Sequence, residues 1–362
     1  GTIAIKGFLM RVALLLLLIG PAYLCFWPIS VSPVAYKPKD DAGLTGNLAP
    51  DGTLDAAEII SLPDGRVGPE DIAPREDGQF YTADNAGALY LFDGQVLQHI
   101  AELGGRPLGL DVGPDGALYI ADSFRGILRW TTDGLAELVT EVEGAPLIYA
   151  NQLDVGRDGA VYFSNSSDRF DPETMGGTKP TSVMAIWEQT SDGYVARRDP
   201  DGTVTKIAEE FVYANGVALS PEEDFLLIAE TGRARVHKLW LSGDKAGTRE
   251  ILMDNLPGYP DNIEPMGDDT YWMAFASPRV PAEALMPYPF LRKVIWRLGP
   301  WVRPAPIEHG VLVHFDGEGE VLRVLQNPSG SLGITTGGRV VGDTLYIMTL
   351  ESRGFGKLEL AK

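Results

Sequence analysis

Six copies of one motif span most of this chain of 362 residues. In each copy, an apolar stretch is followed by a turn rich in Asp and Gly and then by a second apolar stretch. The period of roughly 40 to 50 residues is typical of β-propellers, in which each repeat forms one blade. The sequence therefore predicts an all-β fold, a six-bladed β-propeller, with copies that begin at Gly68, Arg106, Tyr149, Tyr213, Tyr259 and Ser329.

The repeats define the domain organisation better than the length does. A chain of this size could form two or three domains, but the copies place residues 58–362 in one closed propeller. A hydrophobic content of 44% suffices for a large core, and the formal net charge of -20 argues against a nucleic-acid partner. Cys25 is the only cysteine of the chain, so no intramolecular disulfide forms.

The segment 12–27 is uncharged and apolar and follows Lys6 and Arg11. It predicts a membrane anchor, one N-terminal transmembrane helix within residues 1–29. A cleaved signal peptide is the competing interpretation, but the bulky residues that end the segment favour an uncleaved anchor. The preceding basic residues predict a single-pass protein with a cytoplasmic N-terminus and the propeller on the periplasmic or extracytoplasmic side. Residues 30–57, rich in Pro, Gly and Asp, are expected to form an extended tether.

Several polar residues stand where the first strand of a blade begins. Because radial symmetry brings equivalent positions to the same height around the central channel, we expect these side chains to converge. Carboxylate and amide oxygens, without Cys or His, form the ligand set that calcium prefers. The pattern predicts a site for Ca2+, or for another divalent cation; the alternative is that these residues only cap turns. They are Glu70, Asn151, Asn215 and Asp261, with Asn262 next to the last.

Two insertions interrupt the repeats. The first, residues 165–182, is polar, and we expect a strand at residues 183–187, VMAIW, directly after it. The second, residues 279–309, has apolar residues at roughly helical spacing with basic residues between them. Three interpretations remain open for its part 283–303: a lid over the channel, an interfacial helix on anionic lipid, and an ordinary helix packed on the propeller.

The phrases that open the blades include GPEDI, ANQLDV, ANGVALSPEEDFLLIAET and GYPDNI. They resemble those of a group of six-bladed, calcium-dependent propellers that includes regucalcin, gluconolactonases, paraoxonases and the strictosidine-synthase-like proteins. They are most similar to the strictosidine-synthase-like branch, and the apolar N-terminal segment is similar to its membrane-anchored members. The resemblance covers about residues 58–360, and it implies metal ligands at the same blade-opening positions.

Departures from this group limit the reaction that the resemblance implies. Strictosidine synthase uses a glutamate early in the last blade, whereas the stretch GSLGITTGG from Gly330 contains no acid. The condensation of an amine with an aldehyde is therefore not expected. Paraoxonases place a histidine base at the start of the second blade, where this chain has Leu108. A second, buried calcium ion of the paraoxonase type would need two acids; Asp71 is present but Gln152 replaces the other, which leaves this ion open.

These observations predict a membrane-anchored, calcium-dependent hydrolase of small-molecule esters or lactones, of the lactonase or arylesterase type, at the central channel. Asp261 is the candidate metal ligand and catalytic base, a role that the gluconolactonase-like members imply. Glu70 would supply the second charge, and Asn151 and Asn215 would be neutral ligands. The alternative is a non-catalytic, membrane-tethered propeller that serves as a binding or assembly subunit and holds a protein partner.

Overall fold

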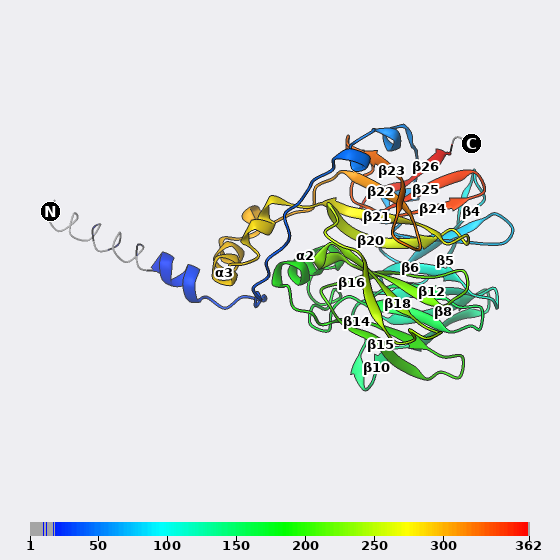
Figure 1. Cartoon of the computed structure of the whole chain (residues 1–362), viewed down its shortest axis with the longest axis horizontal. Coiled ribbons are helices and arrows are strands. Elements are labelled where there is room, and N and C mark those ends of the chain that lie inside the picture. Colours follow the sequence, from blue (N-terminus) through cyan, green and yellow to red (C-terminus); the bar gives the residue numbers. More distant parts are fainter. Residues whose placement is uncertain (1–9, 11, 13–16, 18, 361–362) are drawn as a thin grey trace.

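The computed structural model describes residues 10, 12, 17 and 19–360. Six sheets of four antiparallel strands make up the body of the molecule, which Figure 1 shows from the side, and they confirm the predicted six-bladed propeller. Blades 1 to 3 consist of β2 (Ile72–Pro74), β3 (Phe80–Ala83), β4 (Ala88–Phe92) and β5 (Leu97–Glu102); β6 (Pro107–Val112), β7 (Leu118–Asp122), β8 (Gly126–Thr131) and β9 (Gly134–Val139); and β12 (Ala150–Val155), β13 (Val161–Asn165), β14 (Gly193–Arg198) and β15 (Val204–Phe211).

Blades 4 to 6 follow the same order from the channel outward. They consist of β16 (Ala214–Leu219), β17 (Phe225–Glu230), β18 (Arg235–Trp240) and β19 (Arg249–Met253); β20 (Gly258–Pro265), β21 (Thr270–Pro278), β22 (Gly310–Asp316) and β23 (Val321–Asn327); and β24 (Thr335–Val341), β25 (Thr344–Thr349), β26 (Gly354–Glu359) and β1 (Glu58–Ser61). A separate two-stranded hairpin, β10 (Glu141–Val142) and β11 (Ala145–Pro146), projects between blades 2 and 3.

The ring is closed by its first strand. β1 pairs antiparallel with β26, so that Ile60 lies opposite Phe355, and it becomes the outermost strand of blade 6. The inner strand β16 is buried along its whole length, whereas in the outer strand β15 only Phe211 is buried and the other residues are partly or fully exposed. This difference follows from packing because each inner strand lies between two neighbouring blades.

Apolar side chains of adjacent blades interlock to form the core. Between blades 4 and 5, for example, Leu227 and Val236 pack with Met273, Phe275 and Val313. All of these side chains are fully buried or nearly so. The blades thus form one continuous layer of packed sheets that holds the channel at a fixed width.

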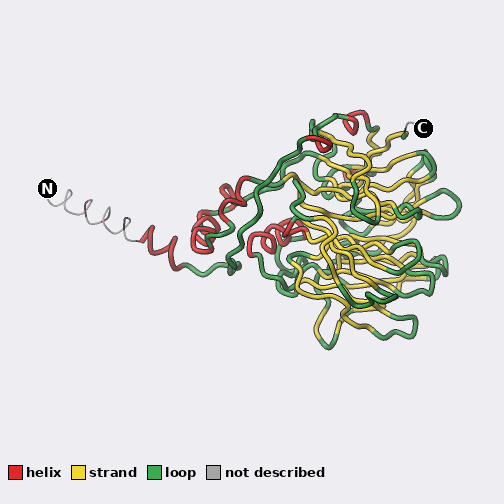
Figure 2. The backbone as a smooth tube through the Cα atoms, viewed as in Figure 1, coloured by secondary structure: helices red, strands yellow, loops and turns green. Residues whose placement is uncertain are grey.

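The helices gather on one side of the propeller, where the N-terminal segment also leaves it (Figure 2). Helix α2 (Thr178–Glu188) begins in the first insertion and continues past its end, which overturns the strand expected at residues 183–187. A short apolar run fits either element, and here the run packs with α3 and the segment around Val31 in one apolar cluster. The second insertion contains the expected helix, with elements η5 (Pro281–Leu285), α3 (Pro289–Leu298) and η6 (Pro300–Val302).

Part of the predicted anchor, residues 1–29, lies outside the described residues; within it, residues 19–26 are helical. None of the described helices has the length and apolar character needed to cross a membrane. Residues 30–57 run along the propeller as extended chain with two 3-10 turns, η1 (Gly46–Leu48) and η2 (Thr53–Ala56). Val31 and Leu54 in this segment are fully buried, so the segment contributes to packing. The remaining short 3-10 helices are η3 (Pro63–Gly65) and η4 (Thr231–Arg233).

Candidate functional site

Four of the predicted ligands lie together in one pocket at a mouth of the channel. Glu70 precedes β2, Asn151 and Asn215 are the second residues of β12 and β16, and Asp261 lies in β20. Each side chain is at least 94% buried. Asn262 does not line this pocket, because its Nδ2 donates to the backbone carbonyl of Glu70 at 3.3 Å. The repeat therefore places side chains from blades 1, 3, 4 and 5 around one point.

The two asparagines present their amide oxygens to the pocket. Asn151 Nδ2 donates to Ser166 Oγ at 2.9 Å, and Asn215 Nδ2 donates to Thr231 Oγ1 at 3.1 Å. Both hydroxyls in turn donate to backbone carbonyls of the next blade, each at 2.7 Å, so they must accept from the asparagines. This leaves both Oδ1 atoms buried without a hydrogen-bond partner. Such unpaired acceptors cost free energy unless a ligand satisfies them.

Ser166 and Thr231 were missed by the sequence analysis. Each follows the last residue of the second strand in its blade, β13 or β17. The signal was present in the repeat: both residues are hydroxylic and stand at the same place in consecutive copies. Ser166 and Thr231 orient the two asparagines. The residues that open the first strands do not by themselves reveal this role.

The two carboxylates oppose each other electrostatically. Burial raises the pKa of Glu70 to about 7, although the nearby Arg106 lowers it. Burial, and then the charge of Glu70, raises the pKa of Asp261 well above its usual range. Two buried carboxylates that disfavour each other's ionisation indicate a place where a cation would be stabilised.

Arg106 is a second residue that the sequence analysis missed. Its Nη2 donates to Glu70 Oε2 at 2.9 Å and to the carbonyl of Leu350 at 3.3 Å, and its Nη1 donates to the carbonyl of Gly68 at 3.1 Å. Both Arg106 and Glu70 are buried, so this ion pair is shielded from water. One oxygen of Glu70 is therefore already neutralised by the protein itself. The position opens the second copy of the repeat, where we considered only Leu108.

The donor set fits a hard divalent cation. It offers carboxylate oxygens of Glu70 and Asp261 and the unpaired amide oxygens of Asn151 and Asn215. Within the described part of the chain, no cluster of three or more His, Cys, Asp or Glu side chains could hold a metal. An ion at this site would thus depend on the two amide oxygens as much as on the two acids.

A profile of the family "Strictosidine synthase" matches residues 151–244, and one of "Strictosidine synthase-like, N-terminal" matches residues 46–92. Adipocyte plasma membrane-associated protein of Bos taurus is 30% identical over 360 residues, which cover 92% of this chain and 85% of that protein. The chain belongs to the strictosidine synthase-like family. Its relatives include strictosidine synthase-like 13 of Arabidopsis thaliana, 36% identical over 246 residues, covering 64% of this chain and 58% of that protein.

Solved structures share the fold of this family member. A gluconolactonase from Xanthomonas campestris superposes with a TM-score of 0.62 at 19% identity, covering 93% of this chain and 100% of that one. A regucalcin from Agrobacterium tumefaciens superposes with a TM-score of 0.54 at 15% identity, covering 80% and 85%. At these identities the likeness establishes the propeller architecture alone.

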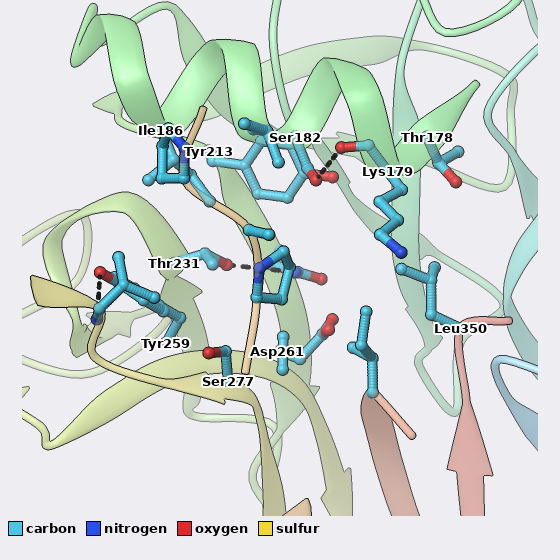
Figure 3. A pocket seen from close by; sticks show the side chains of 18 of the residues that line it. Thr178, Lys179, Ser182, Ile186, Tyr213, Thr231, Tyr259, Asp261, Ser277 and Leu350 are labelled. Carbon is cyan, nitrogen blue, oxygen red and sulfur yellow. Dashed lines mark hydrogen bonds between the residues drawn. The ribbon is translucent and has the colours of Figure 1, made fainter. Parts of the chain in front are cut away.

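The pocket of this strictosidine synthase-like protein is polar at its floor and apolar on its walls. Helix α2 lies across the top, with Ile186 and Ser182 pointing toward the cavity opposite Asp261 (Figure 3). In blade 6, Ile334 lines the wall in the stretch where the sequence lacked an acid. The other apolar lining residues are Val183, Trp187, Val280, Met286, Pro304, Ala305, Pro306 and Leu350.

Tyr213 connects the floor of the pocket to α2. Its hydroxyl lies 2.7 Å from that of Tyr149, which donates to the carbonyl of Thr178 at 2.8 Å. Tyr213 also adopts a positive φ of 63°, a conformation that is uncommon for a bulky residue. Strained backbone of this kind clusters at binding sites, where the surrounding packing enforces it.

A second polar cluster lies further along the channel. Arg339 Nη1 donates to Glu264 Oε2 at 3.0 Å, and its Nη2 lies 3.7 Å from Asp111 Oδ1. Burial raises the pKa of Asp71 to about 6 and that of Asp154 to about 8, although Arg339 lowers both. Carboxylates from blades 1, 2, 3 and 5 therefore share one guanidinium from blade 6.

Gln152 lies within this second cluster. Its Nε2 donates to Asp71 Oδ2 at 3.1 Å and to Glu264 Oε1 at 3.4 Å. An amide donor between two carboxylates suits a channel that is filled by side chains rather than by an ion. The sequence left a second calcium ion open, and the positive charge of Arg339 within this cluster disfavours one.

Proposed function

We propose that the protein is a membrane-anchored, calcium-dependent hydrolase of carboxylic esters or lactones. The observation that carries this proposal is the pair of buried, unpaired amide oxygens of Asn151 and Asn215 beside the carboxylates of Glu70 and Asp261. Ca2+ is the preferred ion, and another divalent cation with hard-ligand preference would suit the same oxygens. When bound, such an ion would polarise the substrate carbonyl and stabilise the negative charge that develops on its oxygen.

The side chains of the pocket supply the remaining steps. Asp261 would accept a proton from the attacking water, whose oxygen forms the new bond to the carbonyl carbon, and would return it to the alkoxide as the ester C–O bond breaks. For a lactone, the ring opens to a hydroxy acid. Glu70 accepts a hydrogen bond from Arg106, which favours its ionised form, and it would balance the positive charge of the site. The apolar walls would exclude bulk water and hold the non-reacting part of the substrate.

The relatives support this assignment in two ways. Gluconolactonase and regucalcin share the propeller fold, and the first acts on a lactone by its name. Several curated relatives are named plasma membrane-associated, which favours a membrane location. We propose that the N-terminal segment anchors the protein in a membrane, single-pass with a cytoplasmic N-terminus and the propeller on the periplasmic or extracytoplasmic side.

Calcium titration of the full chain tests the proposal. Melting temperature, and hydrolysis of phenyl acetate and a γ-lactone, should both rise with calcium. Asn215→Ala should weaken calcium binding at least about tenfold because it removes a ligand oxygen, and Asp261→Asn should abolish hydrolysis. Asn47→Ala, at an exposed position, is the matched control and should behave as wild type. Hydrolysis that is insensitive to both calcium and Asp261→Asn would refute the proposal.

The second candidate function is a non-catalytic binding or assembly subunit that holds a protein partner at the rim. The observation that favours it is the ion pair of Arg106 and Glu70, which already places a cation at the site. The same titration separates the two functions. A calcium-dependent rise in melting temperature without hydrolysis of any ester or lactone would support the binding subunit.

A further inference from the structure

Exposed large apolar side chains are concentrated in two segments of the described chain. Of nineteen such side chains, fourteen lie within residues 10–27 and 288–307. Trp301 is 97% exposed and Phe290 is 57% exposed. Single exposed apolar residues are normal on a protein surface, but a contiguous group marks an interaction surface.

Hydrogen bonds join these two segments into one surface. Arg297 of α3 donates from Nη1 to the carbonyl of Leu24 at 2.9 Å and from Nε to that of Trp27 at 2.7 Å. The hydroxyl of Tyr23 donates back to the carbonyl of Arg297 at 3.1 Å. Helix α3 is therefore fixed at the end of the N-terminal helix. We call the result the α3 surface, formed by Phe26, Trp27, Phe290, Leu298 and Trp301.

The charge of these segments differs from that of the rest of the molecule. The whole chain carries a formal net charge of -20, yet residues 1–39 and 284–307 each contain four basic residues and no acidic one. One of them, Arg292, is buried and donates to backbone carbonyls, whereas Lys293 is partly exposed. Aromatic residues beside basic ones match the interface of a bilayer with anionic headgroups.

The second insertion, residues 279–309, carries most of the α3 surface and also forms part of the pocket wall. On its inner side, Trp296 is buried in a cluster with Trp187 of α2. Pro304, Ala305 and Pro306, which begin three residues after the exposed Trp301, line the pocket. Figure 1 shows α2, α3 and the N-terminal helix on one side of the propeller. The wall of the pocket and the α3 surface are thus two sides of one element.

We infer that the α3 surface rests on an anionic lipid bilayer and that the pocket takes a lipophilic ester or lactone dissolved in that bilayer. The inference about the substrate, unlike that about the lipid contact, rests on the proposed function. The pocket is open to solvent at its mouth, and its walls are apolar, with Ile186, Val280 and Leu350 among them, which suits an alkyl chain that extends toward the mouth. The carbonyl of such a substrate would then face Asp261 and Glu70 on the polar floor.

The first experiment tests the lipid contact without reference to catalysis. Cys25 is the only cysteine, so the Cys25→Ser chain accepts one label at Trp301→Cys or at Val96→Cys. Val96 is also exposed but lies in blade 1, outside the α3 surface. In liposomes of phosphatidylcholine and phosphatidylserine, a nitrobenzoxadiazole label at position 301 should be quenched by spin-labelled lipid, and one at position 96 should not. A label at position 301 that stays as accessible to aqueous iodide as one at 96 overturns the inference.

The second experiment tests the substrate class on the full chain in the same liposomes. The kcat/KM for an octanoyl ester should exceed that for the acetyl ester by at least about tenfold, because the added methylenes are buried. The triple variant F290S/L298S/W301S should lose this preference and keep the acetyl rate. The matched control, V96S/I251S/L322S, removes three exposed apolar residues elsewhere and should retain this preference.

The outcomes separate this inference from the proposed function. Calcium-dependent hydrolysis of both esters without any preference for the longer one overturns the lipophilic substrate and leaves the hydrolase intact. Absence of all hydrolysis, with the label at Trp301→Cys quenched by lipid, overturns the hydrolase and the substrate class together and supports the lipid-facing surface.

Discussion

Arg339 balances several buried carboxylates, and its replacement by Met is expected to destabilise the propeller strongly. The side chain of Met replaces the apolar stem of Arg but ends before the guanidinium, so the change removes the charge and keeps most of the apolar packing. Glu264, 3.0 Å away, and Asp111, 3.7 Å away, would lose their cationic partner. Both carboxylates are largely buried and would have to bind protons or remain as uncompensated charges.

The magnitude follows from this geometry. Removing one partner of a buried ion pair costs about 3–5 kcal/mol, because the other charge stays buried. With a denaturant dependence of about 3 kcal/mol per molar urea, the unfolding midpoint should fall by roughly 1 to 1.7 M. Arg339→Lys should lower the free energy of unfolding by less, because Lys keeps the positive charge and lacks only the forked guanidinium.

Urea unfolding at pH 7.5, followed by tryptophan fluorescence, measures the effect. Arg157→Met is the matched control, because Arg157 pairs with Glu223 in an exposed position and its loss should cost at most about 1 kcal/mol. Arg339→Met combined with Asp111→Asn should recover part of the lost stability. If Arg339→Met costs no more than Arg157→Met, the electrostatic account of the channel is wrong.

Three further predictions follow. Burial raises the pKa of Asp154 to about 8, so the folded state holds a proton that the unfolded state releases above about pH 4. The free energy of unfolding should therefore fall from pH 6 to pH 8. In urea unfolding, Asp154→Asn should show a smaller fall over the same pH range. Arg106→Met should lower the melting temperature in EDTA and enlarge the calcium-induced rise, because Glu70 then depends on the ion alone; an unchanged calcium shift in differential scanning fluorimetry would count against this. Gly68→Ala should cost about 1–3 kcal/mol more in urea unfolding than Gly78→Ala: both glycines have positive φ, but an added Cβ lies 2.6 Å from a backbone oxygen at Gly68 and meets nothing within 4 Å at Gly78.

The repeat pattern predicted the architecture because its information is redundant. Six copies place the strands of each blade in register, and no single copy has to be interpreted correctly. The same symmetry brought Glu70, Asn151, Asn215 and Asp261 to one pocket. The strand expected at residues 183–187 had no such support, since α2 lies in an insertion outside the repeat. A single apolar run of five residues does not separate a buried strand from a buried helix.

The residues that the sequence did not reveal act through contacts between blades. Arg106 reaches Glu70 across 36 positions of the chain, and Arg339 reaches Glu264 across 75. No local pattern encodes such pairings, because the partner is set by the stacking of blades. Ser166 and Thr231 were in principle accessible, since both stand at the same place in successive copies.

The closure of blade 6 by β1 has a consequence for how the chain folds. Glu58 pairs with Lys357, so the first and last strands of the propeller must meet before blade 6 and the ring are complete. During synthesis, β1 has to wait until almost the whole chain has been made, and closing so long a loop carries an entropic cost that slows folding. In this interval the unpaired edges of β1 and β24–β25 invite pairing with other chains. Any product that ends before β26 would keep these edges open permanently, which makes late truncations of this protein a greater aggregation risk than their length suggests.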